Sequence, residues 1–246
     1  MPDHKMKILV TRLPNRAKKL ILMCKEHGIT AVAIPLTEQQ LTESARTLPN
    51  LGRYDWVIIT SVNVVKIIAN QLNIGLSDFA DDVRFATVGK ATAEAVAAHY
   101  QPADIIAEPP SSSGLSDTFI KEISPDDCGN ILWICPEQLV NDIAKILTDA
   151  AYSIDKWQVY KTISRNREIL IKELEAVKPW DAVLFAAPSA VEAFSMIFYD
   201  ITAENCIAIG DTTANALVNR ACSRITIGKS PDLQDVILAI KLAVGL

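Results

Sequence analysis

The chain carries the sequence YDWVIITS at residues 54–61 and a close copy of it, WDAVLFAA, at residues 180–187. The middle of each copy is continuously apolar, which is typical of a strand buried on both faces. A helical pattern follows each copy, VNVVKII after the first and PSAVEAF after the second. A buried strand that leads directly into a helix predicts an α/β fold with parallel strands.

Sequence similarity between the two halves of the chain extends beyond this stretch. Residues 86–96 match residues 207–217, and residues 8–38 match residues 131–163 more weakly. The three matching segments recur in the same order with a period of about 125 residues, which is too long for a solenoid repeat. We therefore expect two copies of one α/β unit.

Short apolar runs alternate with helical patterns along the whole chain. We expect strands at residues 6–11, 30–35, 56–60, 85–88, 131–135, 182–186 and 206–209, and an extended segment at 153–162. We expect helices at residues 15–27, 38–48, 62–72, 90–99, 138–151, 189–198, 212–221 and 232–244, with another opened by residues 111–114. The predicted fold class is α/β, with two similar domains, each a parallel sheet flanked by helices. Ligands of such sheets bind at the carboxyl ends of the strands, and we expect a cleft between two domains that face each other.

The composition excludes several classes of protein. The 246 residues include 24 Lys and Arg against 29 Asp and Glu, and the net charge of −5 argues against a nucleic-acid binder. No charge-free apolar run reaches the roughly 18 residues of a membrane span. The N-terminal sequence MPDHKMKILVTR lacks the apolar region of a signal peptide, so we expect a cytoplasmic protein.

Common catalytic motifs are also missing from the sequence. The nine glycines are too widely spaced for a dinucleotide-binding or phosphate-binding loop, and neither GxSxG nor HExxH occurs. The five cysteines form no CxxC pair, so neither a zinc site nor a disulfide framework is indicated, and we expect them in the core. We expect the three histidines, His4, His27 and His99, at the surface, which disfavours a hydrolase with a histidine base.

Small hydroxyl residues cluster instead where apolar strands run into helices. Six such junctions occur, at residues 11–12, 60–61, 89–92, 111–114, 188–189 and 210–213. One interpretation is helix capping, for which Ser and Thr are preferred. The other is anion binding, because a helix N-terminus offers free N–H groups and a partial positive charge. Several such N-termini together would let a chain of net charge −5 bind a ligand with many carboxylates or phosphates.

Taken in order, these junctions and the strands before them resemble the uroporphyrinogen-III synthase family. The resemblance covers nearly the whole chain and is carried by Thr11-Arg12, residues 55–61 with Asn63 and Val64, Val88-Gly89 with Thr92-Ala93, residues 110–115, residues 131–135, Val159-Tyr160, residues 181–194 and residues 209–217. It implies that residues 1–36 and 165–246 form one discontinuous domain and that residues 39–160 form an inserted one. Linkers would lie near residues 36–38 and 160–164, and residues 35–37 and 159–162 would cross between the domains as a two-stranded ladder.

The resemblance implies a reaction that converts the linear tetrapyrrole hydroxymethylbilane into uroporphyrinogen III for haem biosynthesis. This lyase reaction closes the ring with inversion of ring D and loss of water, and it uses no cofactor and no metal. Unassisted closure gives the type I isomer, so the enzyme mainly controls geometry. A polycarboxylate substrate suits the anion-binding interpretation of the helix N-termini. We expect a cytoplasmic monomer that binds this small molecule and neither nucleic acid nor membranes.

The resemblance also assigns roles to individual residues. Tyr160 is the catalytic candidate, because a phenol can give a hydrogen bond or a proton to the departing hydroxyl, and the alternative is a structural tyrosine on a linking strand. The substrate-binding candidates are Arg12, Thr60, Ser61, Asn63, Gly89, Thr92, Ser113, Ser189, Gly210, Thr212 and Thr213. Arg12 pairs either with a substrate carboxylate or with a helix cap. Ala186-Ala187 departs from the family pattern, in which Thr-Ser or Ser is usual, so one hydroxyl is missing there.

Two other classes of protein share parts of this pattern. A non-catalytic two-domain module that binds a tetrapyrrole or another polyanion would need the same helix N-termini, and activity on hydroxymethylbilane distinguishes it from the synthase. A duplicated receiver or a transporter-type sugar-binding protein fits less well. Receivers need acidic residues at the first strand ends, where Thr11-Arg12 and Thr60-Ser61 stand, and secreted binding proteins need a signal segment.

Overall fold

The computed structural model describes residues 6–139, 141–198, 204–230 and 232–246. By contacts, the chain divides into two compact units. Unit 1 consists of Met1–Glu38 and Ile163–Leu246, and unit 2 consists of Gln39–Thr162.

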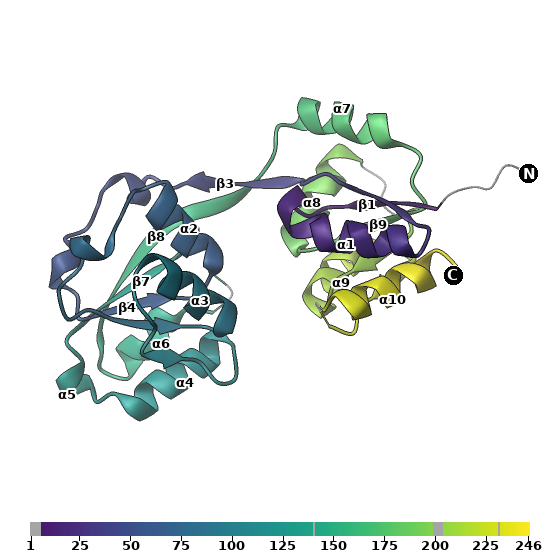
Figure 1. Cartoon of the computed structure of the whole chain (residues 1–246). Coiled ribbons are helices and arrows are strands. Elements are labelled where there is room, and N and C mark those ends of the chain that lie inside the picture. Colours follow the sequence, from purple (N-terminus) through teal and green to yellow (C-terminus); the bar gives the residue numbers. More distant parts are fainter. Residues whose placement is uncertain (1–5, 140, 199–203, 231) are drawn as a thin grey trace, which may run out of the picture. The chain divides into compact units, whose positions relative to one another are not determined.

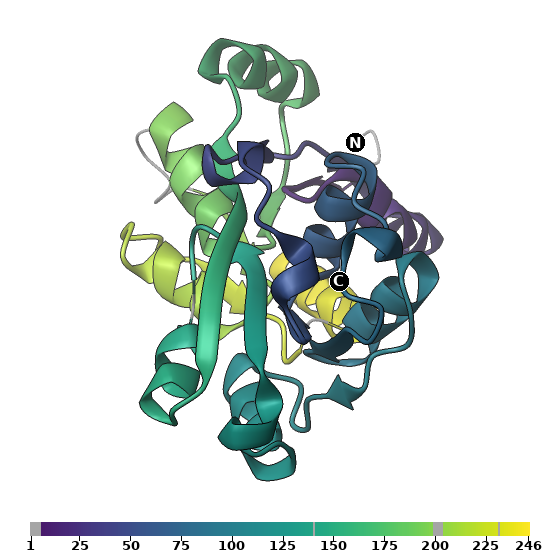
Figure 2. The same ribbon diagram turned by 90° about the vertical axis from the view of Figure 1, so that its left-hand side faces the viewer.

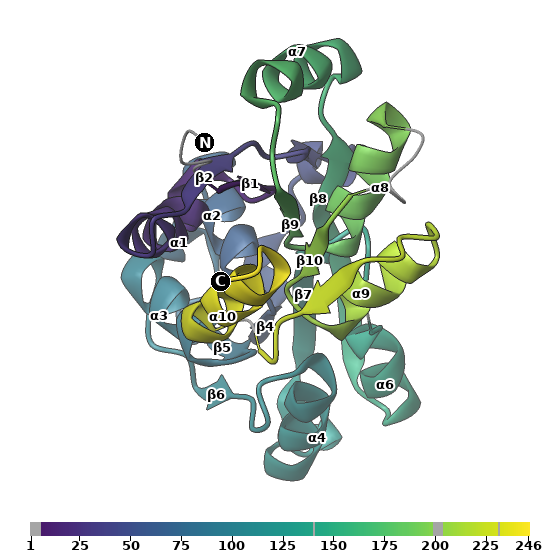
Figure 3. The same ribbon diagram turned by 90° about the vertical axis from the view of Figure 1, so that its right-hand side faces the viewer.

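Unit 1 contains a five-stranded sheet in which neighbouring strands are parallel. In sheet order the strands are β11 (Ile225–Ile227), β10 (Cys206–Ala208), β9 (Ala182–Phe185), β1 (Lys7–Val10) and β2 (Thr30–Ala33). The helices are α1 (Pro14–Glu26), α7 (Arg167–Val177), α8 (Pro188–Ile197), α9 (Asp211–Val218) and α10 (Leu233–Ala243). Figure 3 shows α1 and α10 on one face of this sheet and α8 and α9 on the other.

The interior strand β1, which lies between β9 and β2, is buried on both faces, so its side chains alternate between two cores. Leu9 packs in the core that includes residues of α7, α8 and α9. Ile8 and Val10 pack in the core that includes residues of α1 and α10. This alternation explains why the strand sequence is continuously apolar rather than amphipathic.

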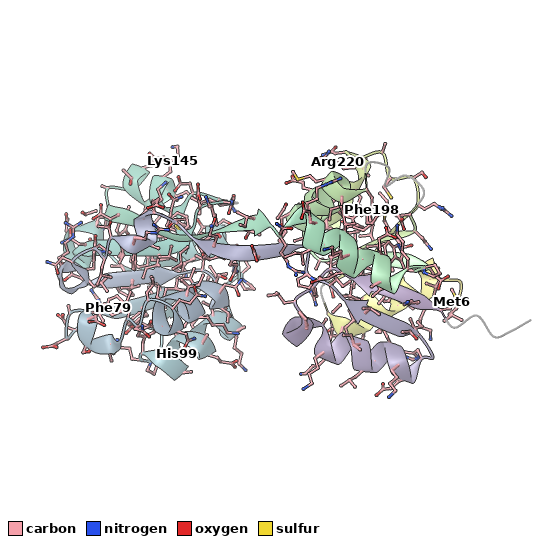
Figure 4. The ribbon with its side chains drawn as sticks, turned by 90° about the horizontal axis from the view of Figure 1, so that it is seen from above. Met6, Phe79, His99, Lys145, Phe198 and Arg220 are labelled. Carbon is pink, nitrogen blue, oxygen red and sulfur yellow. The ribbon has the colours of Figure 1, made fainter. Side chains whose placement is uncertain are left out.

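Unit 2 is built around a six-stranded sheet. In sheet order its strands are β3 (Thr37–Leu41), β8 (Ser153–Ser164), β7 (Asn130–Pro136), β4 (Trp56–Ile59), β5 (Arg84–Thr87) and β6 (Ile105–Ile106). The helices are α2 (Val62–Asn70), α3 (Lys90–His99), α4 (Ser112–Glu122), α5 (Pro125–Cys128) and α6 (Ile143–Asp149), and short 3₁₀ turns lie at Ser44–Arg46, Leu51–Arg53 and Leu76–Asp78. The helices α2 and α3 pack in one core, and α4 and α6 pack in the other. Figure 4 accordingly shows His99 of α3 and Lys145 of α6 on opposite sides of unit 2.

The strands β3 and β8 are hydrogen-bonded neighbours, and Figure 1 shows them running side by side. The Thr42 N–H donates to the Val159 carbonyl at 3.3 Å, and the Arg165 N–H donates to the Leu36 carbonyl at 3.0 Å. Residue numbers rise along one strand while they fall along the other, so this pair is antiparallel. The other neighbouring strands of this sheet, from β8 through β7, β4 and β5 to β6, pair in parallel.

The aspartate of each repeated stretch fixes the start of its strand. The Asp55 N–H donates to the Asn130 carbonyl at 2.9 Å, and the Asn130 N–H donates to Asp55 Oδ2 at 2.7 Å. In unit 1 the Asp181 N–H donates to the Lys7 carbonyl, and the Lys7 N–H donates to Asp181 Oδ2, both at 2.7 Å. A carboxylate that accepts from the neighbouring strand extends the ladder by one charge-assisted bond. Part of the sequence repeat therefore encodes strand pairing.

The predicted fold class, α/β with parallel sheets flanked by helices, is confirmed. The helix predicted at residues 38–48 is wrong: these residues contain β3 and one 3₁₀ turn. The polar sequence TEQQL is a strand because β8 offers it a hydrogen-bonding edge, which overrides local propensity. The helix predicted at residues 138–151 is shorter, since α6 begins at Ile143 after the Asp142 side chain caps it.

Several smaller features also bear on the predictions. His27 and His99 are exposed, as predicted, and His4 lies outside the described residues. All five cysteines are buried free thiols, as predicted. The short elements β6, β11 and α5 and the longer helix α7 were not predicted from the sequence. Within the described part of the chain, no helix has the length and apolar character that crossing a membrane requires.

Candidate functional site

The candidate residues of unit 2 gather at one edge of its sheet. The strands β4, β5 and β6 are adjacent and parallel, so their carboxyl ends lie at the same edge. Each of them leads into a helix, α2 after β4, α3 after β5 and α4 after β6. The chain thereby places three helix N-termini at this edge, with residues 60–61, 89–92 and 111–113 around them.

Ser61 is the cap of helix α2. Its Oγ accepts a hydrogen bond from the Asn63 N–H at 3.1 Å, so the capping interpretation holds for this hydroxyl. The hydroxyl keeps its own proton for donation to a ligand. Thr60, Ser61 and Asn63 are all half-buried.

The N-termini of α3 and α4 lie close together. Gly89 precedes α3 with a φ of +71°, a conformation that favours glycine, and a Cβ at this position would lie 3.3 Å from Pro110 Cβ. Ser111 caps α4 by accepting from the Gly114 N–H at 2.9 Å. The hydroxyl oxygens of Ser111 and the exposed Ser113 are 3.1 Å apart. The N-terminus of α3, in contrast, has no side-chain cap among the described residues.

Unit 1 repeats this arrangement at the carboxyl edge of its own sheet. The strands β10, β9 and β1 are adjacent, and α9, α8 and α1 follow them. The Thr11 hydroxyl donates to the Leu184 carbonyl at 3.0 Å, and its oxygen accepts from the Ala186 N–H at 3.3 Å. Thr11 therefore joins β1 to the end of β9. Its neighbour Arg12 is half-buried and already has an interaction partner.

The departure at Ala186-Ala187 leaves helix α8 without the cap that Ser61 gives α2. Ala187 occupies the cap position, and the helix begins with Pro188 and the half-buried Ser189. Neither α8 nor α9 has a side-chain cap in the part of the chain that the structure describes. The Ala190 N–H donates to the Ala187 carbonyl and the Thr213 N–H donates to the Gly210 carbonyl, both at 3.1 Å. The N–H groups of Ser189, Asp211 and Thr212 are left for water or for a ligand.

Gly210, the cap residue of α9, differs from Gly89 in its backbone conformation and in the space around its Cα. Its φ is −178°, which is extended backbone that any residue adopts, and a Cβ there would meet no atom within 4 Å. The local fold therefore does not require glycine at this position. A ligand that approaches the backbone closely would require it.

Two predicted substrate-binding hydroxyls are buried. Thr92 is 5% exposed and Thr213 is 1% exposed. Each is the third residue of its helix, and the side chain at that position packs toward the sheet. Thr212, one residue earlier, is exposed. At these two helices the groups open to a ligand are accordingly the backbone N–H groups and, at α9, the Thr212 hydroxyl.

Tyr160 lies on β8 at an irregularity in the pairing with β7. The register passes from Cys135 opposite Gln158 to Pro136 opposite Tyr160, so Val159 is an extra residue on β8. Consecutive strand residues normally point to opposite faces, yet Val159 and Tyr160 both pack in the core that contains α2 and α3. A bulge of this kind redirects a side chain, and here it leaves the Tyr160 ring 6% exposed.

The thiols are poor candidates for a nucleophile. Burial raises the pKa of Cys24 and Cys128 to about 11 and that of Cys135 to about 12, so these thiols are protonated at neutral pH. Within the described ranges, no three His, Cys, Asp or Glu side chains are grouped so that they could hold a metal ion. The chemistry-bearing groups at the two edges are thus N–H groups and hydroxyls.

Comparison with known proteins identifies the family of this chain. The family model for uroporphyrinogen-III synthase HemD matches residues 18–237. The chain belongs to the uroporphyrinogen-III synthase family. The resemblance seen in the sequence is thereby confirmed, and it extends over most of the chain.

Three similar proteins are distant from this chain in sequence, at 16–26% identity. The porphyrin biosynthesis protein HemD of Ruminiclostridium josui is 26% identical over 221 residues, which are 85% of this chain and 43% of that relative. The chain thus spans less than half the length of this curated relative. Uroporphyrinogen-III synthetase from Helicobacter pylori 26695 has the same fold, with a TM-score of 0.69 at 18% identity over 96% of this chain and 99% of the other. A mutant synthase from Thermus thermophilus gives a TM-score of 0.60 at 16% identity, over 98% of this chain and 99% of that one.

Sequence reasoning missed two residues at the edges of the synthase units. Ser111 was not named as a site residue, but it is the cap of α4, and its distance of three residues from Gly114 was the available signal. Gln138 was assigned to a helix, but it precedes α6 and bonds to Thr162 on β8. Pro136 was the signal there, because a proline ends pairing within a sheet.

Proposed function

We propose that this protein is a uroporphyrinogen-III synthase. It closes hydroxymethylbilane to uroporphyrinogen III with inversion of ring D and loss of water, as a step of haem biosynthesis. Family membership supports the proposal, and the site chemistry fits it. The observation that carries it is the set of three helix N-termini at the carboxyl edge of each sheet, four of the six without a side-chain cap among the described residues.

These N-termini suit a substrate that carries many carboxylates. Each N-terminus offers N–H donors and a partial positive charge of roughly half an elementary charge. The protein can therefore bind a polyanion although its own net charge is −5. We assign substrate binding to Arg12, Thr60, Ser61, Asn63, Gly89, Thr92, Ser113, Ser189, Gly210, Thr212 and Thr213, with Thr92 contributing its N–H group rather than its buried hydroxyl. The Thr213 hydroxyl is buried and its N–H donates to the Gly210 carbonyl at 3.1 Å, so Thr213 is assigned for its place at the N-terminus of α9.

Tyr160 is the residue that we assign to the departure of the substrate hydroxyl. The phenol donates a hydrogen bond or a proton to that oxygen while the C–O bond breaks, so the hydroxyl leaves as water. The cationic azafulvene that remains bonds to the substituted carbon of ring D and forms a spiro intermediate. This intermediate reopens at the original bond to ring D and closes again with the ring inverted, and loss of a pyrrole proton completes the reaction. The rest of the site holds the chain in the conformation that leads to the type III isomer.

The organisation of the enzyme forms part of the proposal. We propose that residues 1–36 and 165–246 act as one domain and residues 39–160 as the inserted one. The contact division at residues 38–39 and 162–163 supports these boundaries. We also propose a cytoplasmic monomer that works on a small molecule without a metal or cofactor and binds no nucleic acid.

The consumption of hydroxymethylbilane tests this function. The substrate is generated in situ and its disappearance is followed with and without the purified protein. A synthase consumes it much faster than spontaneous closure, in proportion to protein concentration. Binding of the substrate with no change in its rate of disappearance would contradict the proposal and would indicate a tetrapyrrole-binding module.

A further inference from the structure

Beyond Tyr160, strand β8 no longer pairs with β7. Strand β8 continues to Ser164, whereas β7 ends at Pro136. Proline has no N–H and cannot donate the next bond of the ladder. The Glu137 N–H instead donates to the Tyr160 carbonyl at 2.7 Å. Figure 2 shows the long strand β8 beside the shorter β7.

The side chain of Gln138 takes the place of the missing strand. The Thr162 N–H donates to Gln138 Oε1 at 3.0 Å, and Gln138 Nε2 donates to the Thr162 carbonyl at 3.4 Å. One primary amide thus exchanges two hydrogen bonds with the backbone of one residue, as a residue of a facing strand does. A second glutamine reinforces the loop, because Gln158 Nε2 donates to the Glu137 carbonyl at 3.2 Å.

The opposite side of β8 is held by β3. The Thr42 N–H donates to the Val159 carbonyl at 3.3 Å, and the Thr42 hydroxyl donates to the Gln158 carbonyl. Backbone groups of successive strand residues point to alternate sides, so the groups of Thr162 face away from β3. Without Gln138, the side of β8 that lies beyond Tyr160 would have only water to bond.

We propose that Gln138 is a positioning residue for Tyr160. The direction of the Tyr160 ring depends on the bulge at Val159, and a bulge holds its place only while the ladder on both sides of it is fixed. Glu137 fixes the ladder at Tyr160, and Gln138 fixes it two residues later. We call the two hydrogen bonds between the Gln138 side chain and the Thr162 backbone the Gln138 clamp. The effect of this clamp on catalysis rests on the proposed function, but the clamp itself does not.

Two variants of Gln138 separate hydrogen bonding from side-chain size. Gln138→Leu keeps the size of the side chain and removes both bonds to Thr162. Gln138→Glu keeps the acceptor for the Thr162 N–H, so it should retain one of the two hydrogen bonds that Gln138→Leu removes. Gln234→Leu, at an exposed position of α10, is the matched control.

Amide hydrogen exchange and steady-state kinetics are measured on all four proteins. In Gln138→Leu the Thr162 amide exchanges about tenfold faster, and kcat for formation of uroporphyrinogen III falls by about the same factor, as expected for the loss of the two hydrogen bonds to Thr162. KM stays within about twofold, because the clamp acts on the reacting geometry rather than on substrate binding. For Gln138→Glu, both the Thr162 exchange rate and kcat lie between the values of Gln138→Leu and the wild type. Gln234→Leu has the exchange rate and kcat of the wild type.

The outcomes that overturn the inference differ from those that overturn the function. Unchanged exchange at Thr162 in Gln138→Leu would show that no clamp exists. Faster exchange with an unchanged kcat would show that the clamp does not position Tyr160. If the wild type has no synthase activity, the ¹⁹F resonance of 3-fluorotyrosine at Tyr160, assigned with Tyr160→Phe, still decides. A resonance that broadens or shifts in Gln138→Leu supports the clamp, and an identical resonance overturns it.

Discussion

The substitution Gly210→Ala tests whether a ligand approaches the backbone at the start of α9. Gly210 has an extended φ of −178°, and a Cβ there would meet no protein atom within 4 Å. An added methyl group is therefore free of strain and of steric overlap in the unliganded protein. If the substrate packs against this backbone, the methyl group occupies space that the substrate needs.

We expect Gly210→Ala to change the stability of the protein little and to lower its activity strongly. For stability, alanine is a poorer helix cap than glycine by up to about 1 kcal/mol. It also restricts the unfolded chain, which stabilises the protein by about 0.4–1 kcal/mol. The two contributions have opposite signs, so the melting temperature should move by no more than about 4 °C. For activity, losing one hydrogen bond to a charged group costs about 1.5–3 kcal/mol, which lowers kcat/KM by roughly 10- to 150-fold.

Both quantities are measured on the same protein preparation. Thermal unfolding gives the change in stability, and the conversion of hydroxymethylbilane generated in situ gives kcat/KM. A stable variant with normal kcat/KM would refute the inference that substrate reaches Gly210. A fall in the melting temperature well beyond about 4 °C would refute the claim that the local fold does not require glycine there.

Three further predictions concern strand pairing, chemistry and pH. Gly129→Ala should destabilise the protein by about 2–4 kcal/mol in chemical unfolding, because φ is +72° and the new Cβ overlaps the Asp55 carboxylate that pairs with β7; a wild-type midpoint would contradict this. Tyr160→Phe should lower kcat about a hundredfold with little change in KM or melting temperature, and full activity would exclude the phenol from the chemistry. Arg165, 2.9 Å from both oxygens of Glu173, holds the pKa of that carboxyl below its usual 4.5. The extra stability is present above about pH 4.5, amounts to no more than about 1 kcal/mol for this partly exposed pair, and is lost as the pH falls through the lowered pKa. Urea unfolding of Glu173→Gln against the wild type should show a larger difference in stability at pH 7 than at pH 3.

The central parallel strands could be predicted from the sequence because burial on both faces leaves a plain signal. In YDWVIITS the four residues Trp56 to Ile59 are all buried, and the same holds for Ala182 to Phe185 in the second copy. The flanking helices could be predicted because apolar periodicity and glycines or serines mark their ends. Strands of two or three residues, such as Ile105–Ile106 and Ile225–Ile227, are too short for any periodic signal.

Features that depend on a partner strand could not be predicted from local sequence patterns, and the pairing of β3 with β8 was expected only from the family resemblance. The residues of β3 are polar and mostly exposed, and only the edge of β8 makes them a strand. The same limit applies to the sites. The order of strands and helices in the sequence predicts that the hydroxyls lie at helix N-termini. The burial of Thr92 and Thr213 could not be predicted in the same way, because it depends on which side of each helix faces the sheet. The bulge that redirects Tyr160 depends on the register between β7 and β8, which no local pattern encodes.

The identity of the cyclic product tests the central claim most directly. Hydroxymethylbilane generated in situ is incubated with the protein, and the oxidised products are separated into uroporphyrin I and uroporphyrin III. The account predicts that the type III isomer dominates and that its share rises with protein concentration. Only the type I isomer, formed at the rate seen without protein, would contradict it.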